Sequence, residues 1–381
     1  MKIRLKDAFD LQMGKTPARN TPAYWNGSYK WVSIADIGSA GKYITATKEG
    51  ITDKAITESG IRAVPAHTVI MSFKLSIGKT AITSEKMYTN EAIMAFVDNG
   101  TYDIDTNYLY HLCCGTRWTE GTNKAVMGLT LNKATLSEKR ISLPEITEQR
   151  NIAAKFDALD NVIEKTQAEL SSLDQLVKSR FVEMFGEPSI NSMGWAMKPF
   201  VETCILLTGN TPPRAVKGYY GSYIEWIKSD NITTSSLYLT KAAECLSEEG
   251  AKVGRVVHPG AILMTCIAGS LNTVGNVAIV DRDVAFNQQI NALIPQQYET
   301  MFLYVLLQLL KPRLHEAASS ALKCILNKGN LELFKAIVPS VELQKQFAAF
   351  VSEVDKSKLV VKQSLEKLET LKKSLMQQYF G

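Results

Sequence analysis

Two long stretches with the same apolar repeat constrain the fold of this chain most strongly. The first contains neither Gly nor Pro between Glu145 and Phe185, and its apolar residues recur at alternating intervals of four and three, the a/d seam of a coiled coil. About forty residues at about 1.5 Å each predict a rod of roughly 60 Å. Such a helix needs a partner helix to cover its seam. The seam residues are Ile152, Phe156, Leu159, Ile163, Leu170, Leu173 and Val177.

The second stretch repeats the first with an offset of 195 residues. A Pro opens each stretch, and each ends in Phe-Gly. Polar residues such as Thr166 and Lys358 interrupt the seams and can fix their register. A single heptad run is compatible with generic packing or homodimerisation, but a second copy in the same chain favours an intramolecular pair. The second seam consists of Phe347, Val351, Val354, Val361, Leu365, Leu368 and Leu375.

The segments that precede the two rods also repeat. Gly14-Lys15-Thr16-Pro17 matches Gly209-Asn210-Thr211-Pro212, and Trp31 matches Trp226. Short β-like runs with turn signals between them predict an α+β globular domain in each half. The predicted order is a first globular domain over 1–143, a helix over 144–186, a second globular domain over 187–338 and a helix over 339–381. The predicted fold class is therefore α+β with an antiparallel coiled coil and a pseudo-two-fold repeat.

Composition excludes several classes of protein. A hydrophobic fraction of 45% with 21% charged residues is typical of a soluble protein, and no apolar run approaches the ~20 residues of a membrane span. The first residues have no signal-peptide core, and the six cysteines show no C-x-x-C spacing, so we expect a cytoplasmic protein without a zinc site or disulfide framework. A net charge of +5 is compatible with nucleic acid.

Motifs for catalysis are missing from the sequence. Gly78-Lys79-Thr80 resembles the end of a P-loop, but Phe73 stands where the first Gly is required. No G-x-G-x-x-G or G-x-S-x-G is present. The four histidines have no metal-ligand spacing, and we interpret each as a packing or surface residue. The sequence therefore predicts a protein that is not an enzyme and binds no metal.

Polar and basic residues beside matching turns are the candidate binding residues. Two different globular domains on a rigid spacer suit a ligand with its own repeat, such as duplex DNA with about 34 Å per turn. Arg and Lys suit guanine and phosphate, and Asn suits adenine. Any single one of them is more often a solvated surface residue, so the prediction depends on their recurrence. The candidates are Lys15, Thr16, Arg19, Asn20, Lys30, Lys74, Ser76, Lys79, Arg117, Asn123, Lys124, Asn210, Thr211, Arg214, Lys217, Lys228, Ser270, Asn272, Asn276, Lys323, Asn327 and Lys328.

With these features the chain resembles the specificity subunits of type I restriction–modification systems. The likeness is carried by the two Gly-x-Thr-Pro turns, by the Phe-Gly ends of the rods, and by Leu143-Pro144 followed by Glu148-Gln149, which is similar to the family's Leu-Pro-x-x-x-Glu-Gln opening. The second copy keeps Pro339 and Gln344 but has Leu343 in place of the Glu.

The resemblance implies two target-recognition domains, each contacting one half of a split, asymmetric duplex DNA sequence. The paired helices would set the unread spacer and would dock two methyltransferase subunits that carry S-adenosylmethionine. A restriction subunit, a motor-nuclease that uses ATP and Mg, would join them, while this chain would need no cofactor of its own. The alternative is a non-catalytic protein–protein adaptor with two globular heads on a coiled-coil spacer. RNA binding is disfavoured because the aromatic ribonucleoprotein signature is missing.

Overall fold

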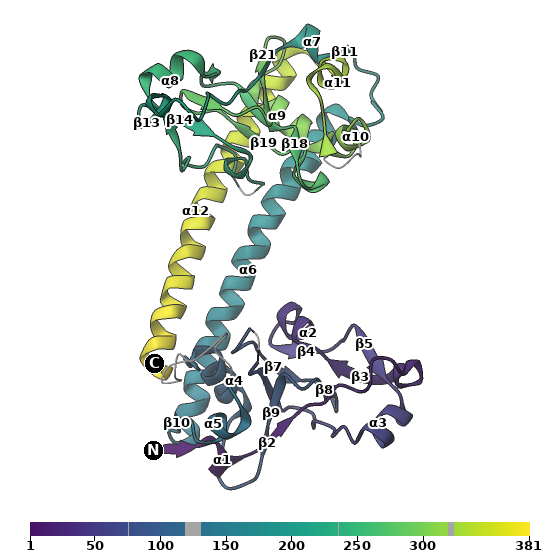
Figure 1. Ribbon diagram of the computed structural model, residues 1–381, viewed down its shortest axis with the longest axis vertical. Coiled ribbons are helices and arrows are strands. Elements are labelled where there is room, and N and C mark those ends of the chain that lie inside the picture. The colour runs from purple at the N-terminus through teal and green to yellow at the C-terminus, as the bar shows by residue number, and fades with distance from the viewer. Residues whose placement is uncertain (75, 119–130, 235, 319–323) are drawn as a thin grey trace. The chain divides into compact units, whose positions relative to one another are not determined.

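The computed structural model describes residues 1–74, 76–118, 131–234, 236–318 and 324–381. The chain divides into two compact units. Unit 1 combines Met1–Gln167 with Gln363–Gly381, and unit 2 is Ala168–Lys362. Each unit therefore contains one α+β globular part, one segment of the first long helix and one segment of the second. Figure 1 labels many of the helices and strands.

The two rods are uninterrupted helices, α6 (Ile146–Phe185) and α12 (Val341–Phe380) (Figure 1). In unit 1 the start of α6 packs on the end of α12, since the rings of Phe156 and Phe380 lie 5.5 Å apart and Lys372 forms an ion pair with Asp160. The helices therefore run antiparallel in this unit.

Unit 2 holds the other ends of the two helices in the same antiparallel manner. Lys358 forms an ion pair with Asp174, and the rings of Phe181 and Phe347 pack edge to face 5.4 Å apart. The predicted fold class, including the antiparallel helix pair, is confirmed. All fourteen seam side chains named from the sequence are buried or half-buried. Phe181 and Phe185, which that seam did not include, are fully buried and join the core of unit 2.

The main sheet of unit 1 has five strands in the order β2-β9-β6-β7-β4. All neighbours are antiparallel except β4 and β7, which are parallel. Helix α4 (Thr106–Gly115), capped by the Asp105 carboxylate, belongs to the core between this sheet and the long helices. The strands are β2 (Phe9–Met13), β9 (Ile93–Asp98), β6 (Val69–Ser72), β7 (Thr80–Thr83) and β4 (Tyr43–Ile44).

Smaller elements complete unit 1. A three-stranded sheet has the order β5-β3-β8, and β1 pairs antiparallel with β10. The strands are β5 (Glu49–Ile51), β3 (Trp25–Val32), β8 (Tyr88–Thr89), β1 (Lys2–Arg4) and β10 (Arg140–Ser142). The short helices are α1 (Leu5–Ala8), η1 (Pro22–Tyr24), α2 (Ile34–Ser39), α3 (Asp53–Ser59) and α5 (Lys133–Ser137).

Unit 2 repeats this architecture. Its main sheet has the order β12-β21-β17-β19, its second sheet β13-β15-β14-β20-β16, and two further pairs are β18-β22 and β11-β23. The main strands are β12 (Cys204–Thr208), β21 (Ile290–Pro295), β17 (Ile262–Thr265) and β19 (Val277–Ile279). The others are β13 (Tyr220–Gly221), β15 (Cys245–Leu246), β14 (Ile224–Ile227), β20 (Val284–Phe286), β16 (Val256–Val257), β18 (Ile267–Ala268), β22 (Cys324–Ile325), β11 (Met197–Pro199) and β23 (Lys335–Ile337).

Over the described ranges, the short helices of unit 2 follow the order of those in unit 1, with two additions. They are α7 (Phe200–Thr203), η2 (Lys217–Tyr219), η3 (Ser229–Asn231), α8 (Glu248–Val253), η4 (Leu271–Thr273), α9 (Thr300–Leu309), α10 (Lys311–Glu316) and α11 (Lys328–Leu333). Helix α9 corresponds to α4, and η4 and α10 are the additions. Among the described residues, no helix combines the length and the apolar character that crossing a membrane requires.

Candidate nucleic-acid interface

In unit 1, three loops meet at one edge of the main sheet. They are residues 14–20 after β2, residues 73–74 and 76–79 after β6, and residues 90–92 before β9, and we call them the edge loops of unit 1. Backbone hydrogen bonds join them: Gly14 N donates to Ile93 O (3.1 Å), and Phe73 N donates to Ala92 O (3.0 Å). Loops that are far apart in the sequence therefore form one surface.

Unit 2 builds the same surface from residues 209–217, 266–276 and 287–289, the edge loops of unit 2. Gly209 N donates to Ile290 O (3.0 Å), and Ile267 N donates to Gln289 O (3.1 Å). The pairing of β18 with β22 also brings the segment before α11 to this edge. The segment that leads to Asn327 thus lies beside the edge loops of unit 2.

Steric contacts explain the glycine of the Gly-x-Thr-Pro motif, and a hydrogen bond explains its threonine. A Cβ atom on Gly14 would lie 2.2 Å from Asn90 O, and one on Gly209 would lie 2.1 Å from Asn287 O, so only glycine fits. The Thr16 hydroxyl donates to the Glu91 carboxylate. These contacts fix the first edge loop onto the segment that precedes β9.

Trp31 and Trp226 each donate a hydrogen bond to the backbone of the Gly-x-Thr-Pro turn in their own unit. Trp31 Nε1 donates to Lys15 O (3.1 Å), and Trp226 Nε1 donates to Asn210 O (3.3 Å). The corresponding threonine of unit 2, Thr211, donates to the side chain of Gln288. The motif residues are thus structural supports of the edge loops.

The arginines of the first edge loop are held by carboxylates. Arg19 forms two hydrogen bonds with Glu49, and its guanidinium lies 3.9 Å from the ring centre of Trp25. The pairing with Glu49 could not be deduced from the sequence, because Glu49 lies thirty residues away on β5. Two donor groups of Arg19 are therefore already used inside the unit.

Arg214 is held in the same way in unit 2. It binds both carboxylate oxygens of Glu244, at 2.9 and 3.1 Å, and stacks over Tyr220 at 4.4 Å. The hydrogen bonds from Arg214 and then from Lys228 lower the pKa of Glu244 to about 2. Arg214 and Lys228 are therefore partners of this carboxylate.

Several other candidate residues also have partners inside their own unit. Lys30 forms an ion pair with Glu85, and Lys328 forms one with Glu332 at 3.3 Å. Asn327 caps α11, since its side chain accepts from Asn330 N at 2.7 Å. Thus these side chains are structural in the free protein.

Two asparagines of unit 2 are likewise engaged. The Asn210 side chain accepts from Arg255 N (2.7 Å) and donates to Val253 O (2.8 Å), so it joins the first edge loop to the end of α8. Asn276 Oδ1 accepts from Lys311 Nζ at 2.6 Å. Sequence reasoning missed Lys311, which carries no motif signal and lies on α10.

The remaining described candidates are exposed to solvent or half-buried. Lys15, Asn20, Ser76 and Lys79 in unit 1 are exposed, and Lys74 is half-buried with its ammonium 5.3 Å from the ring centre of Phe73. Unit 2 exposes Lys217, Ser270 and Asn272 on its edge loops. Arg117 lies outside the edge loops and donates to Gln377 on α12 at 3.5 Å. Asn123, Lys124 and Lys323 lie outside the described residues.

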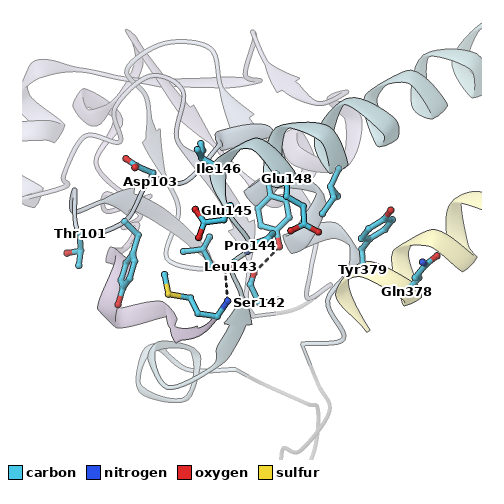
Figure 2. A pocket seen from close by; sticks show the side chains of 14 residues that line it. Thr101, Asp103, Ser142, Leu143, Pro144, Glu145, Ile146, Glu148, Gln378 and Tyr379 are labelled. Atoms are coloured by element: carbon cyan, nitrogen blue, oxygen red, sulfur yellow. Dashed lines mark hydrogen bonds between the residues drawn. The ribbon is translucent and has the colours of Figure 1, made fainter.

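A separate hollow in unit 1, of about 740 Å³, lies where α6 begins. Figure 2 shows the carboxylates of Asp103, Glu145 and Glu148 around it, together with Tyr379 from α12. This acidic lining repels phosphate. The hollow is therefore no candidate for nucleic acid. Within the described parts of the chain, no group of three His, Cys, Asp or Glu side chains could hold a metal ion.

Comparison with protein families gives one match that covers both halves. Residues 1–175 and 194–370 each match the model for the type I restriction modification DNA specificity domain. The chain is 26% identical over 186 residues to the MjaIX type I restriction enzyme specificity subunit of Methanocaldococcus jannaschii, a stretch that covers 48% of this chain and 43% of that protein. It is 26% identical over 213 residues to the HindI specificity subunit of Haemophilus influenzae, covering 50% and 45%. The matched stretches thus span less than half of each relative.

Solved structures share the fold over the whole chain. A chain from a structure on complex assembly and conformational transition of the type I R-M system has a TM-score of 0.64 at 18% identity, covering 100% of this chain and 97% of that one. The type I restriction–modification S subunit from M. genitalium has a TM-score of 0.55 at 14% identity, covering 100% and 96%. At these identities the likeness concerns the fold.

Proposed function

The chain belongs to the family of type I restriction modification DNA specificity proteins, and from this membership we propose that it recognises a duplex DNA sequence in two parts. Each unit contacts one half-site through its edge loops. The observation that carries the proposal is the repetition of these loops, with the same glycine, threonine and tryptophan contacts, in both units. Two surfaces built alike, with different exposed side chains, suit two different half-sites.

The exposed residues of the edge loops, together with half-buried Lys74, have the chemistry that DNA requires. Lys15, Lys74 and Lys79 in unit 1 and Lys217 in unit 2 can neutralise phosphates, and Asn20 and Asn272 can pair with base edges. The candidates with partners inside their own unit would support the loops, or would exchange these partners for DNA groups on binding. We assign the first contacts to the exposed set.

The paired helices serve in this proposal as the spacer between half-sites and as the docking surface for methyltransferase subunits. Their antiparallel pairing within each unit supports this role. The chain itself would catalyse nothing. S-adenosylmethionine would be bound by two methyltransferase subunits, and ATP with Mg by restriction subunits, in the cytoplasm.

Selection of bound sequences from a pool of random duplexes tests the proposal. The full chain, alone and with its methyltransferase subunits, is incubated with the pool, and bound duplexes are sequenced. We expect two short conserved blocks separated by an unread interval of constant length. Bound duplexes without any common bipartite sequence, in both preparations, would rule the proposal out.

A further inference from the structure

The second edge loop of unit 2 is held by its own backbone and by side chains from another element. After β18 the chain forms the 3-10 turn η4, and Gly275 then adopts a φ of +79°, which L-residues with side chains rarely adopt. Ser270 and Asn272 are exposed at its outer side. Backbone hydrogen bonds from Thr273 N to Ser270 O (3.1 Å) and from Gly275 N to Thr265 O (2.8 Å) fix part of the loop, and side chains of another element complete its support.

Lys311, the first residue of α10, supplies these contacts. Its ammonium donates to Asn272 O and to Asn276 Oδ1, both at 2.6 Å. One turn later, His315 Nε2 contacts Val274 O at 2.8 Å. The Lys311 side chain is half-buried, and this burial lowers its pKa. One cation therefore joins η4 to Asn276, the residue before β19.

The corresponding loop of unit 1 is supported by an aromatic ring. Gly78, with a φ of +91°, occupies the place of Gly275, and a Cβ on it would lie 3.4 Å from Trp118 Cδ1. The Trp118 ring is buried, and its Nε1 donates to Cys113 O at 2.8 Å. A Cβ on Gly275 would instead lie 3.3 Å from Lys311 Cγ. The two units thus support equivalent loops by different chemistry.

We infer that Lys311 is a positioning residue for recognition by unit 2, where it holds the 270–276 loop in the shape that contacts DNA. This inference rests on the proposed function. Lys311 acts through Asn272 and Asn276, because its ammonium already binds two acceptors behind the loop. It therefore sets which base pairs are accepted in one half-site and adds no phosphate contact.

The test compares wild type, Lys311→Met and Lys311→Arg as full chains with their methyltransferase subunits. Affinities are measured for duplexes that carry single base-pair changes in either half-site, at several salt concentrations. Wild-type discrimination should be roughly tenfold to a hundredfold per changed pair. We expect Lys311→Met to lose about tenfold of it in one half-site only. The salt slope should not change, and Lys311→Arg should restore part of the discrimination.

Two further variants make the outcome decisive. Lys335→Met removes an exposed lysine of β23 in the same unit and should behave as wild type. Asn276→Ala removes one acceptor of the Lys311 ammonium and should give the same one-sided loss; it decides the matter if Lys311→Met does not fold.

Other results would overturn the inference. They are an unchanged discrimination in both half-sites, an equal loss in both, or a salt slope reduced by about 0.9, which would make Lys311 itself a phosphate contact. If wild type selects no bipartite sequence, the proposed function fails instead.

Discussion

The Gln149 side-chain amide donates a hydrogen bond to the carbonyl oxygen of Pro144, 2.9 Å away, at the start of α6. Its Nε2 also donates to Asp103 O (3.0 Å), while its Oε1 accepts from Asp105 N (3.0 Å). Gln344 repeats the arrangement at the start of α12, with Pro339 O at 2.9 Å. Both glutamines are buried. Each amide therefore joins a long helix to the globular part of its unit.

Replacing this glutamine by leucine should destabilise unit 1. In Gln149→Leu the backbone groups of exposed Asp103 and of half-buried Asp105 and Pro144 lose their buried side-chain partner. Each such loss costs about 1 kcal/mol, so we expect a total of about 2–3 kcal/mol. The midpoint of urea unfolding of the full chain should fall accordingly. Gln346→Leu, at an exposed position of α12, is the control and should unfold like wild type. An equal midpoint for Gln149→Leu would show that the amide contributes little.

His111 on α4 should make the stability of unit 1 depend on pH. Its Nε2 contacts Asp157 Oδ1 at 2.7 Å, but Nδ1 is buried without a hydrogen-bond partner, so a second proton is unfavourable. Burial lowers the pKa of His111 below 6.5, although Asp157 opposes this shift and Lys42 adds to it. The unfolded chain therefore binds the proton more readily. Stability is complete above about pH 6.5 and falls below it by up to about 1.4 kcal/mol per pH unit.

The equivalent residue of α9 is Val305, which suggests the matched variant His111→Val. Unfolding curves of wild type and variant between pH 7.5 and about pH 5 should converge or cross as the pH falls, because only wild type loses stability through this group. Curves that stay parallel over this window would exclude His111 as the cause.

The architecture was predictable because its signals are local and repeated. Heptad spacing in α6 and α12 depends only on residues three and four positions apart, and the offset of 195 residues revealed the second copy of each element. The limits of the seam were harder to predict. Phe181 and Phe185 lie beyond the last predicted seam residue, Val177, yet they are buried against Phe302 of α9, a contact that no local pattern encodes.

The candidate interface was predictable only in part. The motif residues Gly14 and Gly209 do mark the edge loops, because the steric demand for glycine is visible in the sequence as a repeated motif. The partners of Arg19 and Arg214 are about thirty residues away, Glu49 on β5 and Glu244 just before β15, so only the tertiary structure reveals that these arginines are engaged. The role of Lys311 could not be predicted for the same reason.

The two lysines of the second edge loop in unit 1 should contribute to the salt dependence of DNA binding. Removing one phosphate contact lowers the slope of log K against log salt by about 0.9. We therefore expect Lys74→Ala with Lys79→Ala to reduce the slope by up to about 2, with base discrimination kept. The control pair Lys86→Ala with Lys165→Ala lies outside the edge loops. A slope like that of wild type would exclude both lysines from phosphate binding.

Lengthening both long helices should lengthen the unread interval of the DNA site. Seven residues add about 10 Å to a helix, and B-DNA rises about 34 Å per 10 base pairs, so one heptad in each helix corresponds to about 3 base pairs. The heptads are inserted after Gln167 in α6 and after Lys362 in α12, which keeps the seams in register. Insertion into α6 alone offsets the seams and should abolish binding. Sequence selection with the double insertion gives the interval directly, and an interval equal to that of wild type would contradict a spacer role for these helices.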